Sequence, residues 1–234
     1  MKIIASIKKD ERARYISHLD VQRSLQRTVR RANIPIAFSQ GFNPHPLISF
    51  ATALPVGQTG DCEWIELKLE DDMSLFEFMK RMNESFPMGL TVTNAYKAAE
   101  GVPAVATLMQ SAQYTACTGD VADTDKLKDA VQELLDGEII VKKSKKQGGK
   151  KLNDVEVDIR PMVHKITVER ADDGDIKLHI TGRLDASGGL NAELLLRALN
   201  EKAEMDALWK INRDSIDIKP FVYTDEAHLH STNV

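Results

Sequence analysis

The stretch from Tyr15 to Pro46 constrains the fold of this chain most, because it places one capped helix ahead of an extended segment and a rigid loop. Ser17 and Asp20 fit a capping box, in which a hydroxyl and a carboxylate satisfy N–H groups of the first helical turn. At about 100° per residue, the apolar face of this helix holds His18, Val21, Leu25, Val29 and Ala32. The helix therefore packs by one side, and we predict that it ends near Asn33, ahead of Pro35.

The segments around this helix complete a recurring plan. Strands are predicted at residues 2–8, 36–40, 62–70 and 89–96, an extended segment at 47–57, and a second helix at 74–86. The order β-α-β-β-α-β is that of a ferredoxin-like, or split βαβ, unit. Residues 97–109 are rich in small side chains, and we predict that they link this unit to the next.

A second cycle of strands and helices follows the linker. Strands are predicted at residues 111–119, 138–144, 155–161, 162–171, 175–184 and 215–223, and helices at 123–137 and 191–202. We therefore predict an α+β fold of two tandem ferredoxin-like units with antiparallel sheets. The first unit spans residues 1–108, the second spans residues 109–223, and residues 224–234 form a polar, frayed tail.

The cysteine and hydropathy patterns exclude several classes of protein. Among 234 residues the only cysteines are Cys62 and Cys117, too few for a disulfide framework or a structural zinc site and wrongly spaced for an iron–sulfur cluster. No apolar stretch approaches a secretory signal or a membrane-spanning helix. We therefore expect a cytoplasmic protein with free thiols, no membrane contact, no metal and no cofactor.

Positive charge is concentrated near the N-terminus. The formal net charge is −4, yet the first fifty residues carry nine Lys or Arg against three acids. Four guanidinium groups lie within an arc of about 100° opposite the apolar face of the helix: Arg23, Arg27, Arg30 and Arg31. Asp20 is the only acid in the helix, so these groups suit bidentate contacts with phosphates. The alternatives are a solvated face paired with acids elsewhere, or a contact with an acidic protein surface.

A second basic feature is the segment 142–151, which carries six lysines around Gly148 and Gly149. The glycines and the charge predict a mobile hairpin tip, and mobile lysines make sequence-independent contacts with phosphates. The nucleic-acid candidates in this segment are Lys142, Lys143, Lys145 and Lys146. The alternative is a loop that only improves solubility. Together, the two basic features favour nucleic acid over other partners.

The loop GFNPHP, residues 41–46, is the most specific motif of the chain. Gly41 is predicted to take a positive φ, and Pro44 and Pro46 restrict the backbone on either side of His45. An imidazole held in this way suits a binding role or a proton transfer.

His45 and His18 are the two catalytic candidates. His18 lies in the first turn of the helix, so one interpretation is an acid–base pair of the two histidines, or a weak metal site that includes Asp20. The simpler interpretation makes His18 a packed residue, Asp20 a helix cap and His45 a residue that orders its loop by hydrogen bonding. Phe42, with Asn43 beside it, is a candidate for stacking on RNA bases.

Residues 15–57 resemble the DUF2344, or radical SAM-linked, family, and a weaker similarity continues through CEWIEL and VEVDIRP. The matching positions are Ser17, His18, Asp20, Arg23, Arg27, Arg30, Arg31, Ser39, Gly41, Phe42, Asn43, Pro44, His45 and Pro46. In that family the domain occurs alone or fused behind a radical SAM protein of the cobalamin-binding type. The resemblance implies a stand-alone accessory partner, because this chain has no CxxxCxxC motif, and it implies no catalytic residues. KKDERAR, residues 8–14, departs from the glycine-containing turn expected there.

We therefore expect an RNA-binding accessory factor that works with a radical SAM protein in trans, on RNA or on a ribosomal component. In this hypothesis the arginines hold phosphates, while Phe42, Asn43 and His45 contact the bound group. One alternative is a histidine-dependent RNA-processing enzyme that uses His18 and His45. Another is a protein-only adaptor for the radical SAM partner.

Overall fold

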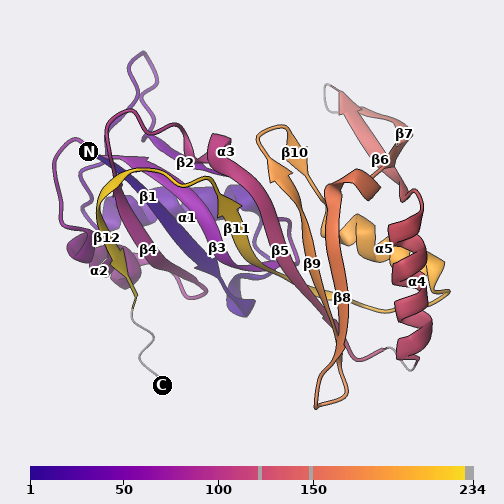
Figure 1. Ribbon diagram of the computed structural model, residues 1–234. Coiled ribbons are helices and arrows are strands. Elements are labelled where there is room, and N and C mark those ends of the chain that lie inside the picture. Colours follow the sequence, from indigo (N-terminus) through magenta and orange to yellow (C-terminus); the bar gives the residue numbers. More distant parts are fainter. Residues whose placement is uncertain (121–122, 148–149, 230–234) are drawn as a thin grey trace. The chain divides into compact units, whose positions relative to one another are not determined.

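The computed structural model describes residues 1–120, 123–147 and 150–229, and of residues 144–147 and 150–154 it describes only the backbone. The chain divides into two compact units, Met1–Gln110 with Asn212–Val234, and Ser111–Ile211 (Figure 1). The fold is α+β, as predicted, and most of its strand pairs are antiparallel. In the described part of the chain, no helix is long and apolar enough to cross a membrane.

The first unit is built on a sheet in which β1 and β3 are central. Its strands are β1 (Lys2–Lys9), β2 (Ile48–Phe50), β3 (Thr59–Lys68), β4 (Leu90–Ala98), β11 (Lys210–Ile218) and β12 (Tyr223–His228). The antiparallel order is β2-β3-β1-β4-β12. β11 runs parallel to β3, and its residues Asn212 and Arg213 pair with Thr59 and Gly60.

Helices α1 (His18–Arg31) and α2 (Leu75–Ser85) pack against one face of this sheet, and Figure 1 shows the sheet from the opposite face. Ser17 caps α1, because its Oγ accepts a hydrogen bond from the N–H of Asp20 at 3.2 Å. The same hydroxyl donates to the Asp20 carboxylate at 2.6 Å. Hydrogen bonds from the Ser17 side chain and, to a smaller extent, from its backbone lower the pKa of the Asp20 carboxyl group, as expected of the predicted capping box.

The second unit combines an antiparallel sheet with helices α4 and α5 and a separate hairpin. Its elements are β5 (Met109–Thr118), α4 (Thr124–Asp136), β6 (Ile140–Gln147), β7 (Lys150–Asp158), β8 (Val163–Arg170), β9 (Ile176–Asp185), β10 (Gly188–Gly189) and α5 (Ala192–Lys202). β9 lies between β5 and β8, and β10 pairs with the end of β9. β6 and β7 pair only with each other in the described structure, and the predicted tip at Gly148 and Gly149 lies outside the described residues.

Two predicted segments of the first unit differ in the structure. Residues 36–40, predicted as a strand, form isolated bridges through Ile36 and Phe38. The predicted linker contains the short helix α3 (Val105–Leu108), whose Val105 is fully buried. Neither segment has a long alternating pattern of apolar residues. Hydrophobic periodicity therefore did not distinguish the isolated bridges from a strand, or the short helix from a linker.

Residues 224–228 of the segment predicted as a polar tail instead belong to the edge strand β12, which pairs with β4, and residues 230–234 lie outside the described residues. The residues of β12 lack apolar alternation because most of them are exposed at the edge, and Ala227 alone packs against the core. Residues 212–223, which the sequence placed in the second unit, therefore belong to the first. Backbone pairing decides this placement, and the hydropathy of the side chains gives little indication of it.

A buried ion pair joins β3 to β11 inside the first unit. Glu63 and Arg213 are 6% and 3% exposed. Arg213 Nε donates to Glu63 Oε1 at 2.8 Å, and Nη2 donates to the second carboxylate oxygen. Because burial removes water from both charges, loss of either partner leaves an uncompensated charge in the interior.

We predict that Glu63→Gln lowers the free energy of unfolding by about 3–5 kcal/mol, because the Arg213 charge loses its buried counter-ion. Urea denaturation followed by circular dichroism measures this change. The matched control is Asp72→Asn, which removes the carboxylate of an exposed pair with Lys97 at 2.8 Å and leaves stability nearly unchanged. Similar effects of the two variants would contradict the importance of the buried pair.

Candidate functional site

The outward face of α1 carries the predicted arginine array. Arg23, Arg27 and Arg30 are exposed. Arg23 Nη1 lies 3.3 Å from an Asp20 carboxylate oxygen, and Arg27 Nε donates to the carbonyl of Arg23 at 3.3 Å. Within the described residues, the Arg30 guanidinium has neither a hydrogen bond nor an ion pair. Among the described residues, Asp20 pairs with Arg23 alone, and neither Arg27 nor Arg30 forms an ion pair, so the array keeps an unbalanced positive charge.

Arg31, the fourth predicted arginine, has a structural contact. Its Nη2 donates to the carbonyl of Ser85, the last residue of α2, at 2.6 Å and to Thr28 Oγ1 at 3.3 Å. A cation near a helix C-terminus is favourable because it meets carbonyls that have no partner within the helix. Arg31 therefore connects α1 to α2, and the outward array consists of Arg23, Arg27 and Arg30.

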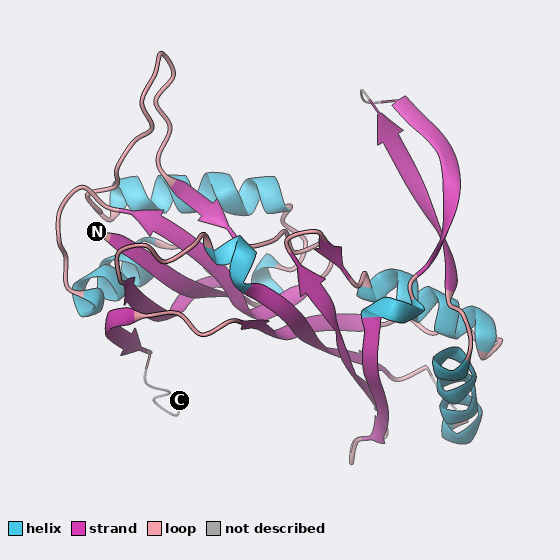
Figure 2. Ribbon diagram, turned by 45° about the horizontal axis from the view of Figure 1, so that its top comes forward, coloured by secondary structure: helices cyan, strands magenta, loops and turns pink. Residues whose placement is uncertain are grey.

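The loop between α1 and β2 projects from the first unit in both views (Figures 1 and 2). Ser39 and His45 close this loop. The N–H of Ser39 donates to the His45 carbonyl at 2.9 Å, and the N–H of His45 donates to Ser39 Oγ at 3.1 Å. Ser39 Oγ also lies 2.8 Å from His45 Nδ1. His45 orders its own loop, which agrees with the simpler of its two predicted roles.

Phe42 lies at the outer end of this loop, and its side chain is 106% exposed. Gly41 takes φ of +124°, the positive value predicted for it. Asn43 is also exposed. A phenyl ring without any covering side chain gains nothing for the fold, so its position on a closed, proline-containing loop is suited to contact with a partner.

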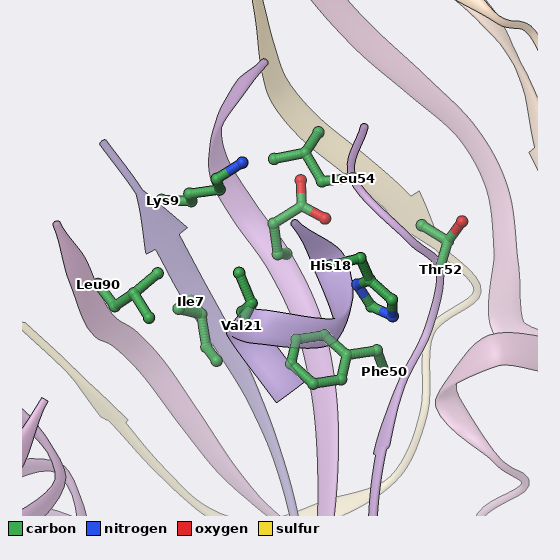
Figure 3. Close-up of a pocket in the computed structure, with 9 residues that line it drawn as sticks. Ile7, Lys9, His18, Val21, Phe50, Thr52, Leu54 and Leu90 are labelled. Carbon is green, nitrogen blue, oxygen red and sulfur yellow. The ribbon is translucent and has the colours of Figure 1, made fainter. Parts of the chain in front are cut away.

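A small cavity lies on the core side of the α1 N-terminus (Figure 3). Its volume is about 20 Å³, which is enough for a single water molecule. Its lining residues are Ile7, Lys9, His18, Val21, Phe50, Thr52, Leu54, Glu63 and Leu90. The His18 ring meets the Phe50 ring edge to face at a centroid distance of 5.0 Å, and His18 Nε2 lies 3.1 Å from Gln22 Nε2.

Buried charges adjoin this cavity. Lys9 is 3% exposed, and its Nζ donates to the carbonyls of Arg14 at 3.0 Å, Ile16 at 3.3 Å and Gln58 at 3.1 Å. Burial lowers the pKa of Lys9, against the opposing effect of the Glu63 carboxylate. These three carbonyls use all three donors of the ammonium group, so Lys9 holds two loops together and has no donor left for a ligand.

The surroundings of His18 disfavour the protonated form of its imidazole. Burial lowers its pKa, Glu63 opposes this effect, and the charges of Arg213 and Lys9 lower the pKa further. A neutral imidazole beside a cavity for one water is able to accept a proton. This observation supports the interpretation of His18 as a candidate base more directly than its position in the sequence did.

The two candidate histidines are not joined by any described contact. His18 contacts Gln22 and Phe50, whereas His45 contacts Ser39. Across the described residues, no three His, Cys, Asp or Glu side chains are grouped as metal ligands. The interpretation that combined His18, Asp20 and His45 in one metal site therefore has no structural basis among the described residues.

The lysine candidates lie in the second unit. Lys142 and Lys143 are on β6, where they pair across the hairpin with Glu156 and Val155. Lys142 is exposed and lines a groove of about 440 Å³ with Glu156, Arg197 and Glu201. The side chains of Lys145 and Lys146 lie outside the described residues. The local charge is therefore mixed, with acids beside the lysines.

The sequence reasoning missed the buried charges, although a signal for them exists. Ile3, Ala5 and Ile7 face the core, and continuing the alternation by one step places Lys9 on the same face. In β3, the residue two positions before the buried Ile65 is Glu63, so the same alternation places the Glu63 side chain in the interior. Reading alternation through charged positions would have identified both residues.

We predict that the His18 imidazole titrates below 6.5, the ordinary histidine value, because burial disfavours its charged form. Since the folded pKa is lowered, the associated stability is present above the ordinary value and is lost as pH falls through the folded pKa. NMR titration of the imidazole resonances measures this pKa, and His18→Gln identifies the signal. A His18 pKa at or above 6.5 would contradict the described environment.

Comparison with known proteins identifies a family. A family model described as "Uncharacterized protein conserved in bacteria (DUF2344)" matches residues 2–192. None of the curated proteins matches the chain. One solved structure, "Crystal structure of putative glycine cleavage system transcriptional repressor", is 10% identical to this chain and is aligned over 91% of this chain and 96% of that chain. Its TM-score of 0.22 is too low to support a structural comparison. Because the family model spans most of the sequence, this chain belongs to the DUF2344 family.

Proposed function

We propose that this protein binds RNA through the first unit. The observation that carries the proposal is the outward array of Arg23, Arg27 and Arg30, which is exposed to solvent and, within the described part of the chain, has a single ion pair, between Arg23 and Asp20. Arginine is suited to phosphate oxygens because its planar guanidinium donates two parallel hydrogen bonds. Arg23 and Arg27 lie one turn apart, and Arg30 follows after three residues, so the row is able to follow a phosphate backbone.

The projecting loop supplies a second contact of different chemistry. Phe42 is free to stack on an unpaired base, and Asn43 is exposed beside it for hydrogen bonding to a base edge. Stacking on aromatic rings is a common means of binding single-stranded RNA because every base has a π-face. The arginine row and the loop tip together favour single-stranded RNA over a duplex.

The lysines of the second unit extend this proposal. Lys142, Lys143, Lys145 and Lys146 would add sequence-independent contacts with phosphates. The acids that adjoin Lys142 reduce the local positive potential, so we assign these lysines a smaller part in affinity than the arginines of α1.

We also propose that each unit follows the ferredoxin-like plan. In the first unit, the strand order β2-β3-β1-β4 supports this plan, with α1 between β1 and β2 and α2 between β3 and β4. In the second unit, the order β8-β9-β5 supports it, with α4 after β5, α5 after β9 and the β6–β7 hairpin inserted after α4.

The biological role that we propose is that of an accessory factor in the cytoplasm, where the protein would help a radical SAM protein act on RNA or on a ribosomal component. The support for this role is the resemblance of the SHLD–R–RR–GFNPHP series to radical SAM-linked proteins. A histidine-dependent RNA-processing enzyme is the second candidate. It is favoured by one observation, the position of His18 beside a cavity for one water, where burial lowers the pKa of the imidazole.

We predict that the double variant Arg27→Glu/Arg30→Glu weakens binding of an oligouridylate at least tenfold. The slope of log K against log salt should also fall by about 0.7 for each arginine removed. Filter binding over a salt series measures both effects. The matched control is Lys126→Glu/Lys128→Glu on α4, which makes the same charge change at exposed positions of the second unit.

Wild-type affinity in the arginine double variant would contradict phosphate binding by α1. Recovery of a radical SAM protein with the wild-type chain after nuclease treatment, together with no RNA affinity, would favour the protein-only adaptor. RNA cleavage that is lost in His18→Ala would favour the enzyme. The same assay with His45→Ala shows whether His45 is also required for cleavage.

We predict that Phe42→Ala lowers RNA affinity by about 1–3 kcal/mol, the value typical of one base stacked on an aromatic side chain. The urea midpoint should not change, because the ring covers no part of the protein. Fluorescence anisotropy with a labelled oligouridylate measures the affinity. Phe42→Trp serves as the control, since it keeps a stacking surface and should keep the affinity. Equal binding by the alanine and tryptophan variants would exclude stacking at this position.

A further inference from the structure

The face of the first unit opposite α1 and α2 carries a second surface with different chemistry. Five rings gather there: Trp64, Tyr96, Phe221, Tyr223 and His228. We call them the aromatic surface. Four of these rings lie with their centroids 5.2–6.0 Å from the ring of Tyr96. Tyr96 follows Ala95, which packs in the core between the sheet and the helices, so alternation directs Tyr96 to the opposite face, the one seen in Figure 1.

The aromatic surface is accessible to a partner. Tyr223 is 44% exposed and Val222 beside it is 69% exposed, while Trp64, Tyr96 and Phe221 are half-buried. Edge-to-face contacts, and a tilted contact between Trp64 and Tyr96, hold the rings in place, so a ligand would meet a surface that is already ordered. Ordered aromatic groups with large contact areas are typical of the centres of binding interfaces.

The charge beside the aromatic surface is negative. Residues 221–229 contain Asp225 and Glu226 and no Lys or Arg. Glu226 pairs directly with Tyr96 across β12 and β4 and therefore lies on the same face. It hydrogen-bonds Tyr223, which raises the pKa of that phenol, and it lies 3.4 Å from His228 Nε2. Two cations lie near these strands in register. Lys97 pairs with Asp225 across β12 and β4 and binds Asp72 at 2.8 Å, and Lys2 is engaged by Glu66 at 3.1 Å and by two carbonyls, so Glu226 is the acid that lies on the face of Tyr96.

The neighbouring strand edge is open. β12 pairs with β4 along one side and is the last strand of the sheet in the described structure. An edge strand presents a row of N–H and C=O groups that accept an added strand from another chain. Carboxylates and aromatic faces next to that edge favour cationic side chains, which interact with both, and disfavour phosphates.

We propose that the aromatic surface and the free edge of β12 bind a basic, extended segment of a protein partner. The segment adds to β12 as a further strand, and one of its arginine or lysine side chains lies over Tyr96 and Tyr223 beside Glu226. This surface is separate from the arginine array on α1, so the proposal does not depend on RNA binding.

The test uses the intrinsic fluorescence of the surface. Trp64 and Trp209 are the only tryptophans of the chain, so the full-length Trp209→Phe protein reports on Trp64 alone. The probe is an acetylated and amidated heptapeptide of alternating threonine and arginine, which places its arginines on one side when extended. The comparison probes are the corresponding threonine–glutamate peptide and decauridylate.

We expect a saturable change in Trp64 emission with the arginine peptide and none with the other two probes. Tyr223→Ala and Glu226→Gln should each weaken peptide binding by about fivefold or more. The first variant removes the ring of the cation–π contact, and the second removes the carboxylate beside the bound cation. Tyr15→Ala is the matched control, because Tyr15 is 79% exposed in the first unit and lies outside the aromatic surface. Hydrogen exchange of the β12 amides should slow when the arginine peptide is bound.

Several outcomes would overturn the proposal. These are the absence of any emission change, an equal response to the glutamate peptide, and peptide binding that Tyr223→Ala leaves intact. A response to decauridylate but not to the arginine peptide would also overturn it and would assign this face to nucleic acid. Near-ultraviolet circular dichroism of each variant confirms that the fold is retained, and Tyr223→Phe keeps the ring if the alanine variant is unfolded.

Discussion

The buried charges of the first unit are the interaction on which the placement of α1 against the sheet depends. Glu63 and Arg213 neutralise each other between β3 and β11, and Lys9 holds the carbonyls of Arg14, Ile16 and Gln58. These carbonyls lie in the segments that precede α1 and β3. The ammonium therefore ties the segment before α1 to the segment before β3, and the helical period of α1 then determines the direction in which the outward arginines point.

The first unit presents two surfaces of opposite character. The helical side carries exposed guanidinium groups and a projecting phenyl ring, whereas the far side of the sheet carries packed aromatic rings next to carboxylates. Because α1 and the aromatic surface lie on opposite faces, a polyanion and a basic segment would not compete for the same residues. An accessory factor that bridges RNA and a protein partner needs such a separation.

Much of this organisation could be predicted from the sequence where one physical signal dominates. The period of α1 and the cap at Ser17 predicted the helix, its buried face and its arginines. The edge strand β12 was missed because backbone pairing determines it. The short helix α3 was missed because the burial of only a few residues determines it. Lys9 and Glu63 were missed for another reason: both continue an alternating apolar pattern, and their charge concealed it. The aromatic surface joins residues from β3, β4, β12 and the segment before β12, which no local pattern relates.

Photocrosslinking with a 4-thiouridine oligonucleotide, followed by mass spectrometry of the digested protein, tests RNA binding by the first unit most directly. The crosslinks should fall within α1 and residues 39–46, with Phe42 among the modified positions, and they should decrease as salt is raised. Crosslinks confined to the sheet face around Tyr96 or to the second unit, or no crosslinks at low salt, would contradict an RNA-binding face on α1.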